Sequence, residues 1–358
     1  MTEPRHPQIR PTRAEIRLDA LTHNLATVRR ESGAAKVFGV IKADAYGHGL
    51  VRVAERLRQD GIDGLAVALT EEGLRLREAG ITGPILVLNG IYDGAHQAVR
   101  DASLTPVVYD SADAERFADL GVGVHLKADT GMTRLGVRDV GAFLGRHPRL
   151  RVAGLMTHLS SAEDDAESTE AQLDAFDRAA AVVRARGHRP ILHVANSAGA
   201  LLHARARHDL VRVGVALYGV RPNAASTLDL RPVMRVVTSI ARVVEVEAGV
   251  AVGYGRTWVA QRPSRVATLA IGYGDGYLRS LSGRGHALVG GVRCPLVGRV
   301  SMDLTGIDVT AVEACRRGDE VIMVGDTLRA EEVAEAAGTI AYEVLCSIAP
   351  RVPRVYID

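Results

Sequence analysis

The stretch Val37-Phe-Gly-Val-Ile-Lys-Ala-Asp-Ala-Tyr-Gly-His-Gly49 begins a regular alternation of two kinds of segment, and this alternation decides the fold. Its first five residues form a short apolar run, which a lysine and a glycine-containing loop follow directly. An amphipathic segment then extends from Leu50 to Arg58. Because short apolar runs alternate with helical patterns in this way as far as about Gly219, the sequence predicts a series of βα units.

Eight short runs in this part of the chain are predicted to be strands. Each is almost continuously apolar, which is typical of strands that are covered on both faces. They span residues 37–41, 65–69, 85–88, 106–109, 123–127, 152–156, 190–194 and 210–213. Eight βα units over ~200–250 residues are typical of a (β/α)8 TIM-type barrel. A doubly wound open sheet is the alternative, because the number of strands does not show whether the sheet closes.

The pattern changes after Arg221-Pro222 to β-branched segments separated by glycine-rich turns. Strands are predicted within residues 234–246, 265–272, 286–297 and 319–324. Only the segment 330–337 has a clear helical pattern. We therefore expect an α/β barrel domain over residues 1–228, with a short N-terminal extension, followed by a mainly β domain over residues 229–358.

The composition excludes several classes of protein. With 44 basic and 42 acidic residues the net charge is +2, which removes the main electrostatic reason to expect a nucleic-acid partner. No apolar stretch approaches the ~20 residues that span a bilayer, and the polar N-terminus lacks the apolar region of a secretory signal. Cys294, Cys315 and Cys346 are too far apart in sequence for a zinc-ligand pattern or a disulfide framework. We expect a cytoplasmic protein with no metal site and no membrane partner.

Lys42 is the first candidate for chemistry. It directly follows a buried strand, and the carboxyl ends of barrel strands carry the active site in enzymes of this fold. Enclosure lowers the affinity of an amine for its proton, which prepares a lysine for Schiff-base chemistry. The alternative is a lysine that extends from a strand end into water.

The sequence resembles the alanine racemase family, whose members are fold-type III enzymes that use pyridoxal 5′-phosphate (PLP). The resemblance begins at Val40–Gly49 and recurs in order over nearly the whole chain. The further motifs are Lys127-Ala-Asp-Thr-Gly-Met-Thr-Arg134, Thr157-His158, Asn196-Ser197, Arg212–Gly219, Val252–Gly255, Gly272–Tyr277, Ser301–Asp303 and Tyr342-Glu343. So many motifs in the same order make the resemblance highly specific.

The resemblance implies which residues bind the cofactor. Lys42 matches the lysine that binds PLP covalently, and Arg212 matches the arginine that faces the pyridine nitrogen. The residues that match the phosphate cradle are Tyr46, Ser197, Tyr342 and the backbone amides of Gly214 and Val215. An arginine cation disfavours a proton on a neighbouring ring nitrogen, so it makes the ring a weaker electron sink than a carboxylate partner would.

The resemblance also implies the residues that bind substrate and transfer protons. Arg134 matches an arginine that contacts the cofactor and the substrate carboxylate. The backbone amide of Met302 and Asp303 match the remainder of the carboxylate pocket. Tyr254 matches the second catalytic base, which serves the L-isomer while Lys42 serves the D-isomer.

Two further residues match supporting positions of the family. His158 matches the histidine that links Tyr254 to Arg212. Lys127 matches a position that is often carbamylated (N6-carboxylysine), where the resulting anion would hold the guanidinium of Arg134 by hydrogen bonds. An unmodified lysine at the end of a strand is the alternative, and the sequence leaves both open.

The activity that the resemblance implies is the PLP-dependent interconversion of L-alanine and D-alanine by two bases, which supplies D-alanine for peptidoglycan. It further implies a homodimer with shared active sites. A broad-specificity amino-acid racemase of the same fold and a non-catalytic PLP-binding protein are the alternatives. A decarboxylase is disfavoured by Arg212, because that chemistry benefits from a protonated ring nitrogen beside an acidic partner.

Overall fold

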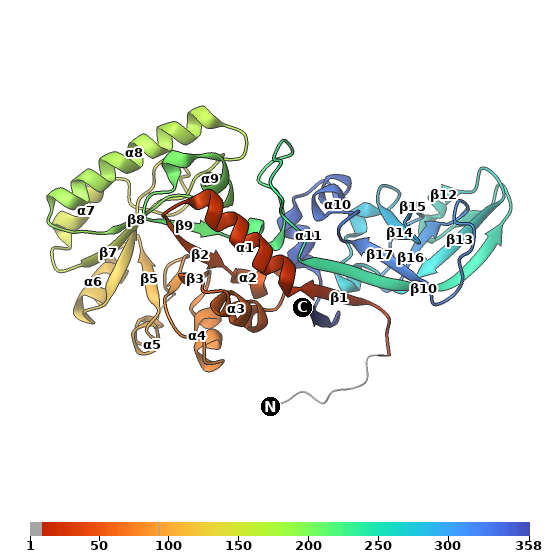
Figure 1. The fold of residues 1–358 in the computed structure, drawn as a ribbon, viewed down its shortest axis with the longest axis horizontal. Coiled ribbons are helices and arrows are strands. Elements are labelled where there is room, and N and C mark those ends of the chain that lie inside the picture. The colour runs from red at the N-terminus through yellow and green to blue at the C-terminus, as the bar shows by residue number, and fades with distance from the viewer. Residues whose placement is uncertain (1–8, 93) are drawn as a thin grey trace. The chain divides into compact units, whose positions relative to one another are not determined.

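The computed structural model describes residues 9–92 and 94–358, and the chain divides into two compact units (Figure 1). Ala20–Arg231 form one unit, and residues 9–19 form the other together with Pro232–Asp358. The boundary between residues 228 and 229 stays a prediction. The structure adds that β1 (Arg13–Arg17) pairs with strands of the C-terminal unit.

Within the described residues of Ala20–Arg231, eight strands form one parallel sheet in the order β8-β7-β6-β5-β4-β3-β2-β9. The strands are β2 (Lys36–Val40), β3 (Gly64–Val67), β4 (Ile85–Val87), β5 (Thr105–Val108), β6 (Gly123–Lys127), β7 (Arg151–Met156), β8 (Ile191–His193) and β9 (Leu210–Val213). Each overlaps one of the eight predicted strands.

Hydrogen bonds between the two end strands and the residues that flank them close this sheet into a barrel. The Asp209 amide donates to the carbonyl oxygen of Leu192 (3.1 Å), and the Arg212 amide donates to that of Ala195 (3.0 Å). The carboxylate of Asp209 also accepts a hydrogen bond from the Leu192 amide (2.8 Å). The predicted barrel is therefore confirmed, and the open doubly wound sheet is excluded.

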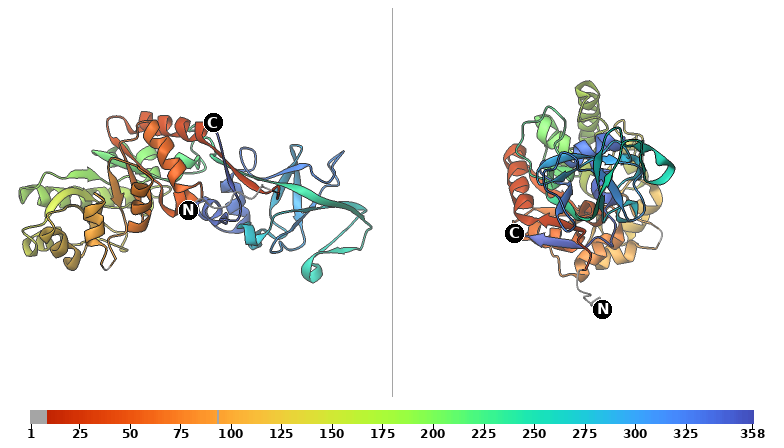
Figure 2. Two further views of the ribbon diagram at one scale, coloured as in Figure 1. Left: turned by 90° about the horizontal axis from the view of Figure 1, so that it is seen from below. Right: turned by 90° about the vertical axis from the view of Figure 1, so that its right-hand side faces the viewer.

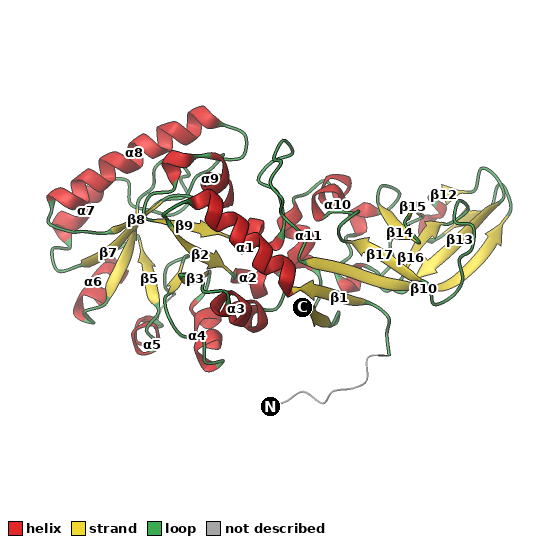
Figure 3. Cartoon of the chain, in the orientation of Figure 1, coloured by secondary structure: helices red, strands yellow, loops and turns green. Residues whose placement is uncertain are grey.

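Helices alternate with the strands along the chain, and Figure 3 distinguishes the two by colour. They are α1 (Leu18–Ser32), α2 (Lys42–Tyr46), α3 (Leu50–Gln59), α4 (Thr70–Glu78), α5 (His96–Asp101), α6 (Ser111–Asp119), α7 (Val140–Arg146), α8 (Ala166–Ala185) and α9 (Ser197–Leu202). The helix α8 buries Leu173, Phe176, Ala180 and Val183, which recur at helical spacing opposite a charged face. In the described part of the chain, no helix is long and apolar enough to cross a membrane.

The barrel gathers the candidate residues at one rim. Lys42 follows β2 after a single residue, Lys127 ends β6, His158 lies just after β7, Ser197 follows β8 and Gly214 follows β9 directly. Because all eight strands are parallel, their carboxyl ends meet at the same end of the barrel. Residues far apart in sequence are thereby brought into one site.

The C-terminal unit is mainly β, as predicted. Its described residues contain a sheet in the order β13-β16-β15-β14-β17-β10-β1-β18, with a further pairing of β13 with β10. Besides β1, the strands are β10 (Met234–Val246), β13 (Ser264–Leu269), β14 (His286–Val289), β15 (Val292–Val297), β16 (Thr305–Asp308), β17 (Glu320–Val324) and β18 (Arg354–Ile357). A separate hairpin is formed by β11 (Ala251–Val252) and β12 (Trp258–Val259).

The long strand β10 organises this sheet, because it pairs with β1, β13 and β17. The strand β18 pairs with β1 in parallel, which places strands from the two ends of the chain side by side (Figure 2). Neither β1 nor β18 was predicted from the sequence.

The expectation of a single helix in this unit was wrong. The helix α10 (Ala330–Ala337) has the predicted bounds, but α11 (Ala341–Ser347) follows it after three residues. Seven residues complete two helical turns, which is too short for a clear periodic pattern. The helix forms because Ala341, Val344 and Leu345 are buried on one face.

A change in the buried face of α8 tests the packing of the barrel. Phe176 is fully buried, so Phe176→Ala is expected to lower the free energy of unfolding by about 3–5 kcal/mol. Val182 of the same helix is 39% exposed, and Val182→Ala is expected to cost less than about 1 kcal/mol. Urea unfolding followed by circular dichroism measures both. Equal losses in the two variants would contradict this packing.

Candidate functional site

Lys42 begins a turn of unusual backbone conformation. The four residues after it, 43–46, have φ angles of 53° to 56°, in the left-handed region that side chains rarely adopt. Within this turn the Ala45 amide donates to the carbonyl oxygen of Ile41 (2.8 Å). The Glu72 carboxylate of α4 accepts a hydrogen bond from the Ala43 amide (2.6 Å). A run of such residues is strained and persists only where surrounding contacts hold it.

Buried rings also contact the turn. The Nδ1 atom of His48 lies 2.9 Å from the carbonyl oxygens of both Ala45 and Tyr46. The Tyr218 ring centroid lies 4.5 Å from that of His48 and 4.9 Å from that of Tyr46, and its hydroxyl donates to the Val40 carbonyl oxygen (3.2 Å). These contacts fix the direction of Tyr46, whose side chain is buried.

Hydroxyl groups meet at Gly214, directly after β9. The Ser197 hydroxyl oxygen accepts hydrogen bonds from the amides of Gly214 (3.1 Å) and Ala216 (3.4 Å). The Tyr46 hydroxyl lies so close that a Cβ atom on residue 214 would be 2.5 Å from its oxygen, so only glycine fits. Val215 is the first residue of the short 3₁₀ turn that follows. Hydroxyls and backbone amides at one point suit the oxygens of a phosphate group.

The guanidinium of Arg212 is buried in the barrel. Its Nη1 donates to the carbonyl oxygen of His193 (3.0 Å), and its Nη2 donates to those of Thr157 (2.7 Å) and Val194 (2.9 Å). Within residues 9–92 and 94–358 no carboxylate pairs with it. Burial lowers the pKa of Arg212 to about 9. The cation is therefore stabilised by carbonyl dipoles rather than by an ion pair.

Two histidines extend the contacts of Arg212. Because Arg212 Nη1 donates to the Nδ1 atom of His193 (3.0 Å), the proton of this imidazole lies on Nε2, which donates to Nδ1 of His125 (2.8 Å). Burial and then Arg212 lower the pKa of His125 to about 4, and burial lowers that of His193 well below its usual value. Both rings are neutral, and the described residues contain no group of His, Cys, Asp and Glu side chains that could hold a metal ion.

Burial beside other cations also lowers the pKa of Lys127 and His158. For Lys127 burial has the largest effect and Arg212, Arg134 and Lys42 add to it, so that its pKa is about 8. For His158, burial, then Arg212 and then Lys127 lower the pKa to about 3. Lys127 therefore has a much larger neutral fraction near pH 8 than an exposed lysine, and His158 is neutral.

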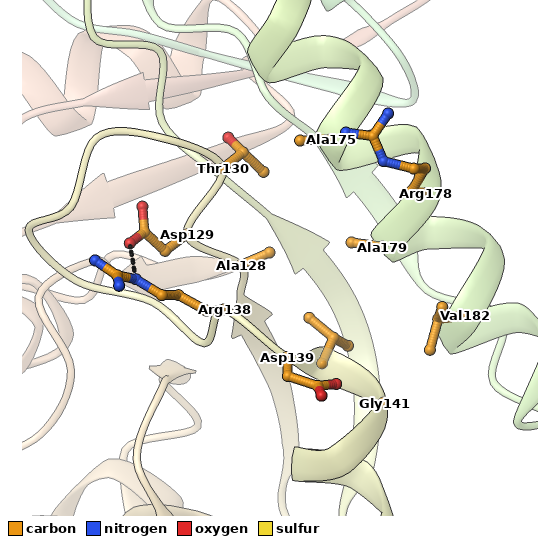
Figure 4. Close-up of a pocket in the computed structure, with 11 residues that line it drawn as sticks. Ala128, Asp129, Thr130, Arg138, Asp139, Gly141, Ala175, Arg178, Ala179 and Val182 are labelled. Atoms are coloured by element: carbon orange, nitrogen blue, oxygen red, sulfur yellow. Dashed lines mark hydrogen bonds and ion pairs between the residues drawn. The ribbon is translucent and has the colours of Figure 1, made fainter.

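Arg134 is exposed, in a loop that Asp129 shapes after β6. The Asp129 carboxylate accepts hydrogen bonds from two loop amides (2.9 and 3.2 Å) and pairs with Arg138 (3.5 Å). The loop returns to the strand where the Val137 amide donates to the carbonyl oxygen of Lys127 (2.8 Å). Figure 4 shows the Asp129–Arg138 pair at the wall of a groove of about 360 Å³ between this loop and α8.

The remaining candidate residues belong to the C-terminal unit. Tyr254 follows β11 in a short turn between Gly253 and Gly255, and it is 72% exposed. Met302, 55% exposed, and Asp303 lie between β15 and β16. Tyr342 is the second residue of α11.

Two domain families match the chain, one after the other. Residues 16–222 match the model of the alanine racemase N-terminal domain, and residues 233–356 match that of the alanine racemase C-terminal domain. The chain belongs to the alanine racemase family. The resemblance inferred from the sequence motifs is therefore confirmed.

Individual alanine racemases are similar over almost their whole length. An alanine racemase of Sorangium cellulosum is 47% identical, with 97% of this chain and 99% of that protein covered. The crystal structure of alanine racemase from Streptomyces lavendulae has a TM-score of 0.92 at 34% identity and covers 99% and 98% of the two chains. That of Bartonella henselae alanine racemase with covalently bound pyridoxal phosphate has a TM-score of 0.91 at 31% identity, covering 97% and 99%.

Sequence reasoning missed several residues that shape this rim of the barrel. His125 and His193 each follow apolar residues within a buried strand, and a histidine in such a strand is a signal that could have found them. Asp129 and Glu72 act through backbone amides, and no pattern in the sequence indicates such contacts.

The neutral histidine pair predicts how the stability of the barrel depends on pH. The pKa of His125 is about 4 in the folded protein and 6.5 for an ordinary histidine. Between these values the unfolded chain binds a proton that the folded chain does not, so stability falls as the pH is lowered from about 6.5 to about 4. The contribution of His125 to this loss is about 3 kcal/mol.

His125→Gln cannot titrate, so its midpoint of urea unfolding is expected to fall less steeply over this pH range than that of the unchanged protein. His188→Gln, in the turn before β8, serves as the matched control and is expected to keep the steep dependence. Parallel curves for His125→Gln and the unchanged protein would contradict the neutral state of His125.

Proposed function

We propose that this protein interconverts L-alanine and D-alanine with PLP as its cofactor and supplies D-alanine for peptidoglycan. The observation that carries the proposal is the meeting of Lys42, the buried Arg212 and the hydroxyls around Gly214 at one rim of the barrel. This arrangement lies in a chain that matches both alanine racemase domain families.

The barrel residues fit the two ends of PLP. The Ser197 and Tyr46 hydroxyls beside Gly214 suit the phosphate, together with the amide of Val215. Arg212 suits the pyridine nitrogen, and Lys42 supplies the amine that holds the aldehyde carbon. Tyr342 would complete the phosphate cradle. When bound, the cofactor withdraws electrons from Cα of the amino acid and so acidifies its C–H bond.

Two side chains would move the proton at Cα. The Nζ of Lys42 removes it from D-alanine or returns it on that face, and the hydroxyl oxygen of Tyr254 does so for L-alanine on the opposite face. A phenol is a weak acid, so Tyr254 needs cations nearby to act as a base. His158, neutral at physiological pH, is proposed to link Tyr254 to Arg212 by hydrogen bonds.

Arg134 and the segment Met302-Asp303 are proposed to bind the substrate carboxylate. Lys127 is proposed to be carbamylated: its neutral amine adds CO2 and releases a proton, which replaces a cation by an anion. The lowered pKa of Lys127 favours this reaction because only the neutral amine is nucleophilic. The carbamate would then accept hydrogen bonds from Arg134 and hold it in place.

Arg212 limits side reactions. Because it is a fixed cation, it disfavours a proton on the ring nitrogen beside it. Negative charge at Cα is then stabilised less and is short-lived. This favours prompt return of the proton over transfer of the amino group. This suits an enzyme that moves a single proton.

A homodimer with shared sites is part of the proposal. Large apolar side chains of the C-terminal unit are exposed in this chain by itself: Tyr254, Tyr273, Met302, Leu304 and Ile340. Tyr273, Met302 and Leu304 lie close together around Ser301, the residue before Met302. The Tyr273 amide donates to the Ser301 carbonyl oxygen, and the Ser301 amide donates to that of Leu304 (both 2.9 Å). Exposed apolar patches are typical of protein interfaces. A second copy would bring Tyr254 and Met302 to the partner's barrel.

We also propose a cytoplasmic location, because the three cysteines are not joined by disulfides in the described part of the chain.

Incubating the protein with L-alanine and measuring D-alanine by chiral chromatography tests the activity. Other amino acids in the same assay separate an alanine racemase from a broad-specificity racemase. Absence of D-alanine with PLP bound would favour a non-catalytic binding protein.

Tyr254→Phe tests the two-base assignment. The change removes one exposed oxygen, so PLP binding is expected to survive, and the absorption of the bound cofactor is the control. Exchange of the Cα hydrogen of L-alanine with deuterated solvent is expected to fall about 10²–10⁴-fold, the usual contribution of a positioned acid–base group. Exchange on D-alanine is expected to persist in part through Lys42. Exchange of L-alanine at the original rate would show that Tyr254 is not the base.

Mixing two inactive variants tests the shared site. Lys42→Ala lacks the lysine and Tyr254→Phe lacks the second base. If each site takes these residues from different subunits, a mixed dimer contains one intact site, and refolding the two chains together is expected to restore part of the activity. No restoration, or sedimentation of the active protein as a monomer, would refute shared sites.

A further inference from the structure

The glycine-rich turn Gly272–Tyr277 of the C-terminal unit has no role in the proposed mechanism. A Cβ atom on Gly272 would overlap the backbone of Ser301 and Met302, and one on Gly274 would lie 3.0 Å from the Met302 carbonyl oxygen. Gly272 is therefore required, and Gly274 favoured, because this turn lies directly against the segment Ser301–Asp303. No dinucleotide needs to be invoked to explain them.

Backbone hydrogen bonds join the turn to that segment. The Tyr273 amide donates to the carbonyl oxygen of Ser301 (2.9 Å), and the Gly274 amide donates to that of Met302 (2.8 Å). The position of Met302 therefore depends on the position of the turn.

A buried carboxylate lies at the centre of the same turn. The side chain of Asp275 is fully buried and accepts hydrogen bonds from both terminal nitrogens of Arg10 (2.5 Å each) and from the Gly272 amide (2.9 Å). Burial alone would raise its pKa, but the bonds from Arg10 and Gly272 outweigh burial and hold the pKa below the usual value. Asp275 is thus a fixed anion.

Arg351 connects this anion to the segment. Its Nε lies 2.7 Å from an Asp275 oxygen, while its Nη2 donates to the Asp303 carboxylate (2.8 Å) and lies 3.4 Å from the Met302 carbonyl oxygen. Different nitrogens of one rigid guanidinium make these contacts, which a lysine with a single nitrogen cannot reproduce. The cation also compensates the Asp303 carboxylate, which would otherwise repel an approaching anion.

We infer that Asp275 and Arg351 are positioning residues that hold Met302 and Asp303 in place to receive the substrate carboxylate. The inference rests on the proposed function, in which this segment binds the carboxylate of alanine. Asp275 and Arg351 do not touch the reacting atoms. They act through the segment that Arg351 contacts.

Two variants and a matched control test the inference in the full-length protein loaded with PLP. Arg351→Lys keeps the charge and removes the bridging geometry. Asp275→Asn keeps the shape and removes the anion that orients Arg351. Arg293→Lys is the control, because Arg293 is 44% exposed against 43% for Arg351 and likewise contacts a carboxylate, Glu332, and a backbone carbonyl oxygen.

Steady-state kinetics give the first measurement. Arg351→Lys is expected to raise the KM for L-alanine about tenfold, the loss expected when one charge-assisted hydrogen bond is weakened, with kcat changed less than about threefold. The inhibition constant of propionate, which is alanine without its amino group, is expected to rise by a similar factor. Arg293→Lys is expected to match the unchanged protein.

Amide hydrogen exchange gives a second measurement that does not depend on activity. The amides of residues 273–274 and 301–304 are expected to exchange faster in Arg351→Lys and Asp275→Asn, relative to β17 as an internal reference. This ratio remains informative if Asp275→Asn lowers overall stability. Kinetics and exchange in Arg351→Lys that both equal those of Arg293→Lys would overturn the inference.

Failure of the proposed function gives a different result. If the unchanged protein does not racemise alanine while Arg351→Lys still loosens residues 301–304, the two side chains position the segment but the assignment of its ligand is wrong. If the unchanged protein racemises alanine and the exchange and KM of Arg351→Lys are unaltered, only the positioning role is wrong.

Discussion

A buried guanidinium held by backbone carbonyl oxygens is the interaction on which the barrel site depends. Arg212 is stabilised by carbonyl oxygens at or just beyond the ends of β7 and β8. Because one of its nitrogens donates to His193, that ring is held neutral and its remaining proton points to His125. The same cation lowers the pKa of Lys127 and His158, although burial contributes more. Burial and this one cation together therefore favour the neutral forms of the groups around it.

Close backbone approaches provide the second constraint, one in each unit. In the barrel, the left-handed turn after Lys42 directs Tyr46 against Gly214, where no side chain fits. In the C-terminal unit, the turn at Gly272 lies against Ser301–Asp303 for the same steric reason. Strain in the first turn is offset by the buried contacts of His48 and Tyr218, not by local propensity.

The sequence predicted the barrel well because its strands are buried on both faces and are therefore mostly apolar, with only a few buried polar residues such as His193 and Arg212. It predicted β10 and α10 for similar local reasons. It did not predict β1 or β18, since Arg13–Arg17 and Arg354–Ile357 are short, carry charges and become strands only by pairing with each other and with β10. The helix α11 was missed because two turns show no clear period.

The sequence by itself determined the order of βα units, the lysine at the end of β2 and the motifs that identify the family, because these are properties of neighbouring residues. Only the tertiary structure decided that Arg212 has carbonyl partners, that His125 and His193 are neutral, and that Arg351 joins Asp275 to Asp303. The physical reason is that protonation and hydrogen bonding depend on burial and on distances between groups that are remote in sequence. Those distances exist only once the barrel has closed and the C-terminal sheet has formed.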